Sequence, residues 1–326
     1  MTWTEKGVCL GEGRVFKEKD GSPVAFCART ALIKALDAAK KLGLTFTLGF
    51  EIKFVLMKRG EKGEFEPLDN DGHAWRVRRH GPPGERTRGQ YEIVLPKAPA
   101  LEAVDTLLYA RNVLSSHATS TGYRMTLHPK PFAMACGTAS HVHISVDGDK
   151  GNDPAIYEPF YAGILKHLRA ICAFTYSSDA SYERVADGTW AGGTYVAWGT
   201  QNRERPLRKI AGSHWEIKCM DGIANAYLAL AVVVTAGARG VREGEAGLRR
   251  EVPAGMTEDE QAALGIRTRI PRTLGGALEA LFRLKSVWGV VGNHEKSGLP
   301  DDVVPVASQD IIHEIVKRYC IPHTCM

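Results

Sequence analysis

The stretch His141-Val142-His143-Ile144-Ser145-Val146 alternates polar and apolar residues along its whole length. Side chains of a β-strand point alternately to its two faces, so a period of two predicts a half-buried strand. One face then carries two imidazoles and a hydroxyl group, while the other carries three aliphatic side chains. Such a strand belongs in a sheet whose apolar face is covered and whose polar face is open.

Three other stretches alternate in the same way, at residues 50–54, 90–95 and 214–218. Their polar faces carry mainly ionisable side chains, namely Glu51, Lys53, Gln90, Glu92, His214, Glu216 and Lys218. Four strands of this kind predict an α+β fold in which a curved, mainly antiparallel sheet is covered by helices on its apolar face. The polar face is expected to line a cleft.

The residue types on the predicted cleft face favour a metal ion. Two histidines and three glutamates suit a divalent cation such as Mg²⁺ or Mn²⁺, which takes carboxylate and imidazole ligands. The alternative for any single strand is an ordinary solvated face. One strand with His-x-His beside three strands that each carry a glutamate favours the metal-binding interpretation.

The remaining segments are assigned from periodicity and from Gly and Pro signals. Helices are predicted at 28–42, 100–121, 157–176, 222–238, 275–288 and 308–319. The helix at 222–238 is apolar on most sides, so it is expected to be buried. Residues 58–89 are charged and rich in Gly and Pro, which predicts a loop over the cleft, and residues 243–270 are interpreted as an exposed insertion.

Composition excludes several classes of protein. The 326 residues carry a net charge of only +5 with both signs interspersed, which does not favour nucleic-acid binding. The most apolar run, 229–234, is too short to span a bilayer, and the first residues lack the layout of a signal peptide. Seven scattered cysteines without a C-x-x-C spacing are typical of reduced thiols, so we expect a cytoplasmic protein without a membrane partner.

Six motifs follow one another in the order of a known family. The stretches concerned are 49–54, 89–92, 126–132 with Gly137, 141–145, Asn202-Arg203 with Arg208, and 216–237. The first two resemble the strands G-x-E-x-E-F and P-G-Q-x-E, and the third and fourth together resemble the block F-M-P-K-P … H-x-H-x-S. The fifth resembles the paired substrate arginines of the family, and the sixth resembles R-x-E-x-R … A-N-P-Y-L-A … A-G. Over about residues 25–300 the chain resembles the catalytic domain of the glutamine synthetase superfamily, and it is nearest in style to the glutamine-synthetase-like half of fungal FluG-type proteins.

The resemblance also implies a domain division. Residues 1–26 would be a short remnant of the family's β-rich N-terminal domain, and residues 27–326 would form the catalytic domain. Relatives share each active site between neighbouring subunits of a ring through that N-terminal domain. We therefore expect no shared-site ring, while a smaller homo-oligomer stays open.

The resemblance implies two metal positions, and the chain differs from the family at one of them. Glu51, His141 and Glu216 match the first position. At the second position Glu92 is present, Glu85 is an uncertain match, and Lys53 replaces a carboxylate. An ammonium group repels a cation and pairs with a carboxylate. We therefore predict an ion pair between Lys53 and Glu92, and at most one bound Mg²⁺ or Mn²⁺.

Other roles follow from the resemblance alone. It implies that Glu92, Arg203 and Lys53 lie at the reacting centre. It implies substrate contacts by Arg184, Arg203, Gly137 and Lys218, and contacts with a nucleotide such as ATP by His143, Ser145, Arg208 and His214. His214 and Lys218 stand where the family has arginines, and a lysine lacks the two-pronged grip of an arginine.

Three hypotheses about function remain open at this point. The first is an ATP-dependent ligase that joins a small carboxylate to an amine, with ordinary glutamine synthesis weak or lost. The second is an enzyme on the same fold that no longer uses ATP and performs acid–base or Lewis-acid chemistry on a small metabolite. The third is a descendant without catalytic activity that binds a ligand or partner.

Overall fold

The computed structural model describes residues 27–68, 89–132, 137–148, 151–187, 191–245, 248 and 251–284. The predictions for residues 1–26, for Glu85 and for a helix at 308–319 lie outside these ranges. The loop predicted at 58–89 lies inside them only at its two ends.

Within the described residues nine strands form one sheet around the long strand β1 (Thr45–Arg59). The main path runs β2-β1-β6-β9-β8-β7, and β3, β4 and β5 also pair with β1. The other strands are β2 (Phe65–Pro67), β3 (Gln90–Val94), β4 (Ala98–Pro99), β5 (Arg124–Thr126), β6 (Val142–Asp147), β7 (Trp198–Thr200), β8 (Leu207–Ala211) and β9 (His214–Ile217). Every pairing is antiparallel except that of β7 with β8, so the predicted mainly antiparallel sheet is confirmed.

In strand β1, the alternation of apolar and polar residues places these two kinds of side chain on opposite faces of the sheet. Between Phe46 and Phe54 the apolar side chains of the strand are Phe46, Leu48, Phe50, Ile52 and Phe54, and all five are buried. The side chains between them, including those of Glu51 and Lys53, are only partly buried. Aromatic and β-branched residues favour such a pleated, half-covered strand.

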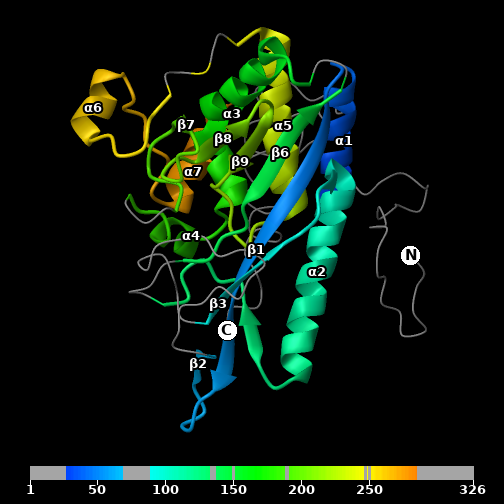
Figure 1. Ribbon diagram of the computed structural model, residues 1–326, viewed down its shortest axis with the longest axis vertical. Coiled ribbons are helices and arrows are strands. Elements are labelled where there is room, and N and C mark those ends of the chain that lie inside the picture. Colours follow the sequence, from blue (N-terminus) through cyan, green and yellow to red (C-terminus); the bar gives the residue numbers. More distant parts are fainter. Residues whose placement is uncertain are drawn as a thin grey trace, which may run out of the picture.

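Helices cover the apolar face of the sheet, as Figure 1 shows. They are α1 (Ala28–Lys40), α2 (Ala100–Ser120), α3 (Pro154–Thr175) and α5 (Ala226–Glu243). Helix α3 packs directly on the sheet: the ring of Phe160 lies 5.2 Å from that of Phe46, and Tyr161 stacks on Trp215 at 4.2 Å. Helix α5 packs between α1 and α3, and its buried residues confirm the prediction from its apolar sequence.

Local signals explain where these helices begin and end. The side chain of Asp153 accepts from the amide of Ala155 and so caps α3, whose first residue is proline. Asn225 caps α5 in the same way, and Gly244 ends it in the left-handed conformation that glycine adopts readily. Three shorter helices, α4 (Asp179–Glu183), α6 (Glu258–Ala263) and α7 (Leu274–Phe282), complete the described part of the chain.

The interpretation of residues 243–270 as an exposed insertion holds for most of the described residues of this segment, but not for Val252, Gln261, Ile266 and Ile270, which are buried. Val252 and Ile266 are buried and pack with Tyr195 and Ala197 in a small second core. The amide of Val252 donates to the carbonyl of Trp198, which ties the segment to the end of β7. The apolar residues of this segment are widely spaced and follow no helix or strand period, so their burial had no periodic signal.

None of the helices in the described ranges combines the length and hydrophobicity needed to cross a membrane.

Candidate functional site

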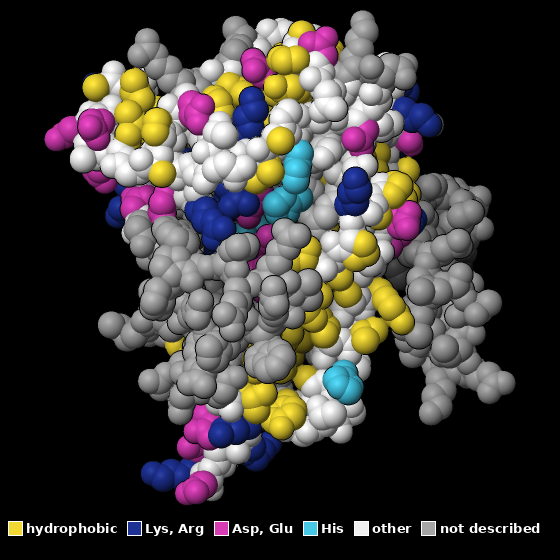
Figure 2. All heavy atoms as spheres, viewed as in Figure 1, with side chains coloured by type: hydrophobic (Ala, Val, Ile, Leu, Met, Phe, Trp, Pro, Cys, Tyr) yellow, Lys and Arg dark blue, Asp and Glu magenta, His cyan; other side chains and the backbone are white. Residues whose placement is uncertain are grey.

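The register of the sheet brings the four polar stretches together. Lys53 lies directly opposite Glu92 on β3, and His143 lies opposite Glu216 on β9. Strand β6 runs between β1 and β9, so His143 in this strand and His141 just before it lie between the glutamates of the two neighbouring strands. Figure 2 shows histidine side chains at the surface over β6 and β9, beside a group of Lys and Arg side chains.

The centre of the site is a cluster of two carboxylates and one imidazole, formed by Glu51, His141 and Glu216. The Nδ1 atom of His141 lies 3.1 Å from Oε2 of Glu51 and 2.8 Å from Oε1 of Glu216. All three side chains are largely buried. This is the trio that the sequence predicts as metal ligands, and the structure brings it together.

The cluster fits a divalent cation. Ligands bound about 2.1 Å from Mg²⁺ in an octahedron lie about 3 Å from their neighbours, and the two distances from His141 to the glutamates are of this size. Among the described residues, the three ligand atoms that all lie within 4.8 Å of one another belong to Glu51, Glu216 and His143, so His143 completes this group and His141 lies beside it. Two carboxylates and one or two imidazoles are a donor set that suits Mg²⁺ or Mn²⁺.

Electrostatics keep both carboxylates ionised. Burial alone would raise the pKa of Glu51, but the Lys53 ammonium and hydrogen bonds from His141 and His143 lower it well below its usual range. Burial likewise opposes ionisation of Glu216, yet the hydrogen bond from His141 and its charge interactions lower its pKa to about 2. Burial and the charge of Lys53 lower the pKa of His141, whose Nδ1 atom faces the two carboxylates while its Nε2 atom is buried without a hydrogen-bond partner.

The Lys53–Glu92 ion pair predicted from the sequence is present. The Lys53 Nζ atom lies 3.3 Å from Glu92 and 3.4 Å from the Oε2 atom of Glu51. Although burial opposes the charge, the nearby carboxylates of Glu51, Glu92 and Glu216 raise the pKa of Lys53. A permanent ammonium therefore stands between two carboxylates beside the His141 cluster.

A second chain of contacts links the cluster to β9. The Nε2 atom of His143 lies 3.3 Å from Glu51, and its Nδ1 atom lies 2.9 Å from Nε2 of His214. A carboxylate only accepts, so His143 carries its proton on Nε2 and accepts at Nδ1 from His214. Burial, with the neighbouring His143 and Arg208, lowers the pKa of His214. Ser145 pairs with His214 across the two strands and lies on the same face.

Cations surround the other side of Glu216. The Nε atom of Arg208 lies 2.7 Å from its Oε2 atom, as an ion pair without the alignment of a hydrogen bond. The ammonium group of Lys218 is buried and donates to the carbonyl of Arg203 at 2.8 Å. Burial lowers the pKa of Lys218 to about 8, with the charges of Lys53 and Arg208 adding to the effect.

Arg184 is held more tightly than its sequence indicates. It is buried, and it donates to the hydroxyl of Tyr176 at 3.2 Å and to the carbonyl of Lys218 at 3.4 Å. Gly137 lies against its aliphatic stem, where an added Cβ would come within 2.2 Å. Sequence reasoning missed Tyr176, because a tyrosine at the end of an apolar helix carries no signal beyond packing.

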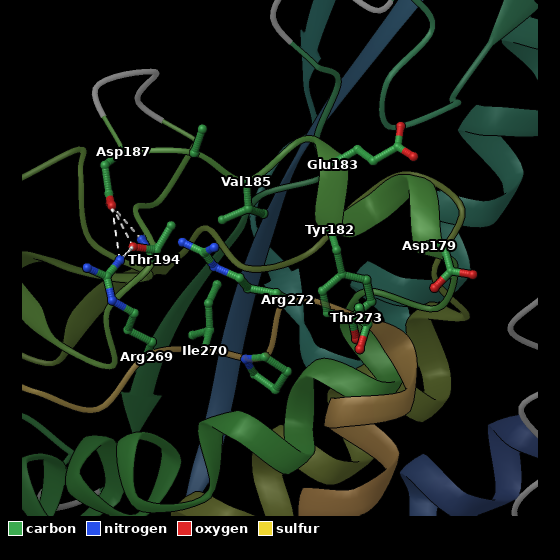
Figure 3. Close-up of a pocket in the computed structure, with 12 residues that line it drawn as sticks. Asp179, Tyr182, Glu183, Val185, Asp187, Thr194, Arg269, Ile270, Arg272 and Thr273 are labelled. Carbon is green, nitrogen blue, oxygen red and sulfur yellow. Dashed lines mark hydrogen bonds and ion pairs between the residues drawn. The ribbon is translucent and has the colours of Figure 1, made fainter.

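A separate cavity of about 500 Å³ lies beside α4 and the start of α7 (Figure 3). Its lining includes Asp187, Thr194 and Arg269, which contact one another: Arg269 lies 3.7 Å from Asp187 and donates to Thr194 at 2.9 Å. None of the predicted site residues lines this cavity. The cavity is therefore separate from the Glu51, His141 and Glu216 cluster.

Comparison with known proteins agrees with this geometry. The model of the glutamine synthetase catalytic domain matches residues 74–295. The chain is 39% identical to the fluG protein of Emericella nidulans over 300 residues, which is 82% of this chain but only 34% of that protein. It is 33% identical to the glutamine synthetase of Mycolicibacterium smegmatis over 317 residues, covering 84% of this chain and 71% of that enzyme.

Solved structures show the same fold. One, named "GmaS/ADP complex-Conformation 1", has a TM-score of 0.73 at 22% identity and covers 91% of this chain and 74% of its own. Another, named "Crystal structure of novel glutamine synthase homolog", has a TM-score of 0.64 at 24% identity over 90% and 77% of the two chains. The match to the family model and the 33% identity to a glutamine synthetase show that the chain belongs to the glutamine synthetase catalytic-domain family.

Proposed function

We propose that the chain is a ligase of the glutamine synthetase type, which uses ATP to join a small carboxylate to an amine and binds a single divalent ion. The observation that supports this most directly is the meeting of Glu51, His141 and Glu216 at 2.8–3.1 Å with arginines and lysines around them. The 33% identity to a glutamine synthetase over most of the chain supports the reaction class.

In this proposal each group has a task that follows from its chemistry. Glu51, His141 and Glu216 hold the ion, which neutralises charge on the phosphoryl group being transferred. Arg208 lies next to the ion ligands and adds a fixed positive charge for phosphate. His143, Ser145 and His214 line the same face of the sheet and are proposed to contact the nucleotide.

The carboxylate substrate is proposed to bind on the side of Arg184, Arg203 and Lys218. The backbone of this side is tied together, because Lys218 donates to Arg203 and Arg184 donates to Lys218. A rigid set of cations suits a carboxylate better than a neutral ligand. Gly137 leaves the space into which the stem of Arg184 fits.

Ordinary glutamine synthesis is proposed to be weak or lost. Lys53 takes the place of a metal-binding carboxylate and pairs with Glu92 at 3.3 Å. One ammonium group neutralises less charge than a divalent ion does, so phosphoryl transfer loses part of its electrostatic stabilisation.

The same observation favours a second candidate. A cluster that already contains Lys53 beside Glu51 and Glu92 has acid and base groups in place without a nucleotide. The alternative is an enzyme that binds one divalent ion and carries out Lewis-acid or acid–base chemistry on a small metabolite without ATP.

Phosphate release separates these candidates. The purified chain is incubated with ATP, Mg²⁺ and a panel of carboxylates and amines, and inorganic phosphate is measured. Phosphate release that needs both a carboxylate and an amine would support the ligase. A bound metal ion without any nucleotide affinity would contradict it and favour the second candidate.

Two further properties stay predictions, namely a small homo-oligomer and a cytoplasmic location. Light scattering of the purified chain tests the first, and a large ring of subunits would contradict it.

A further inference from the structure

The charged groups of the site form one continuous chain of contacts. It runs from Glu92 to Lys53, Glu51, His141, Glu216 and Arg208, and every link is 3.4 Å or shorter. The chain alternates acidic groups with basic or imidazole groups, so every carboxylate in it already has a partner.

The cluster is also close to neutral in charge. Three carboxylates face two permanent cations in direct contact, Lys53 and Arg208. The ammonium group of Lys218 is buried close enough to interact with Glu216, Lys53 and Arg208. A free divalent ion entering this cluster therefore finds little net negative charge to attract it.

Lys53 also competes for one of the ligand atoms. The Oε2 atom of Glu51 faces both the Nδ1 atom of His141 and the Nζ atom of Lys53, at 3.1 and 3.4 Å. An ion that used this oxygen would lie beside a buried ammonium, and the two positive charges would repel each other. Removal of the ammonium charge would leave the ligands in place and relieve that repulsion.

We propose that Lys53 keeps the carboxylate cluster from binding a free divalent ion, so that the ion binds together with an anionic co-ligand such as a nucleotide polyphosphate. The anion supplies the negative charge that the cluster lacks and offers a new partner for the lysine. Coupling of this kind is reciprocal, so the ion must tighten the binding of the anion by the same factor. The inference rests on the proposed function, since it takes the proposed ion and nucleotide as the two ligands.

The first experiment measures binding of Mn²⁺ alone, by the electron paramagnetic resonance signal of the free ion. Lys53→Met and Lys53→Gln remove the charge, and both are expected to bind Mn²⁺ at least tenfold more tightly than the unmodified chain. Lys53→Arg keeps the charge and is expected to bind as weakly as the unmodified chain. Two neutral variants keep the test valid if one of them fails to fold.

A matched control is available on the same strand. Lys58 of β1 also pairs with a glutamate on the neighbouring strand, since its Nζ atom lies 3.5 Å from Glu66 of β2. This pair is half exposed and belongs to the β1–β2 hairpin. Lys58→Met should therefore leave the affinity for Mn²⁺ unchanged. Equal affinities in the unmodified chain and in both neutral Lys53 variants would overturn the proposal.

The second experiment measures ADP binding by calorimetry with and without Mg²⁺, corrected for the Mg–ADP complex in solution. For the unmodified chain we expect Mg²⁺ to tighten ADP binding at least tenfold, and for Lys53→Met by a clearly smaller factor. Mg²⁺-independent ADP binding would overturn the coupling even if phosphate release shows a working ligase. Phosphate release can also fail while the Mn²⁺ comparison succeeds, so failure of the proposed function is distinguishable from failure of this inference.

Discussion

Two neighbouring parts of the polar face of β1 have opposite character, although they lie only two residues apart. At Glu51 two carboxylates converge on the imidazole of His141, at 3.1 and 2.8 Å. At Lys53 an ammonium group stands between Glu51 and Glu92. Both residues point to the same face because of the strand period, so a single residue type decides whether a position of this cluster attracts or repels a cation.

The largest expected effect on stability concerns the cluster of Glu51, His141 and Glu216. Glu216→Gln removes a buried charge that contacts both His141 and Arg208. Loss of one partner of a buried ion pair leaves the other uncompensated, so we expect a loss of about 3 kcal/mol of unfolding free energy in urea.

The control for this variant is Glu66→Gln, which removes the partner of the half-exposed Lys58. An exposed pair of this kind contributes at most about 1 kcal/mol. Equal losses in the two variants would show that the buried cluster is no more important for stability than a surface pair.

The pH dependence of the unfolding free energy should reflect the ionisation of Glu216 in the same cluster. The pKa of Glu216 is lowered from 4.5 to about 2 in the folded chain, so its ionisation stabilises the fold above pH 4.5. That stabilisation is lost as the pH falls toward 2, by up to about 3 kcal/mol over the whole window.

Urea unfolding at a series of pH values measures this effect as a difference between the unmodified chain and Glu216→Gln. The difference should shrink steadily as the pH falls below 4.5. A difference that stays constant down to pH 3 would contradict the lowered pKa.

A smaller effect is expected where Arg184 is held. Gly137→Ala places a Cβ atom 2.2 Å from the stem of Arg184 and from the carbonyl oxygen of Pro129, so one of them must move. Overpacking of this kind costs about 1–3 kcal/mol, and the displaced guanidinium should also weaken carboxylate binding. Thermal unfolding and calorimetric titration with L-glutamate measure the two effects.

Gly275→Ala serves as the control, because its added Cβ would find no atom closer than 3.9 Å within helix α7. Alanine favours the helix over glycine, so this variant should be neutral or more stable. If Gly137→Ala behaved in the same way, the tight contact with Arg184 would be in doubt.

The smallest expected effect concerns the histidine chain beside the cluster. His143→Ala removes the imidazole that donates to Glu51, and partners of metal ligands typically change metal affinity by about tenfold or more. Binding of Mn²⁺ in the presence of ADP measures the change. Lys58→Met, which removes a half-exposed ion pair outside the site, should leave the affinity for Mn²⁺ in the presence of ADP unchanged.

Much of the polar face could be predicted from the sequence because the strand period is local. The alternation around Glu51, His141 and Glu216 assigns each side chain to a face before any pairing is known. The Lys53–Glu92 pair followed from the family resemblance, and the register of β1 and β3 places the two residues opposite each other.

Other features could not be predicted, because they depend on contacts between distant segments. The His143–His214 hydrogen bond requires the register of β6 and β9, and the link from Arg184 to Tyr176 requires the fold around α3 and α4. The burial of Val252 depends on a small core assembled from separate loops without any periodic pattern.

Anomalous diffraction from crystals soaked in Mn²⁺ and ADP tests the central claim most directly, because it counts the ions and locates them. The account predicts one peak in contact with Glu51, His141 and Glu216, with Lys53 still beside Glu92. Two peaks flanking Glu92, with Lys53 displaced from the cluster, would contradict it.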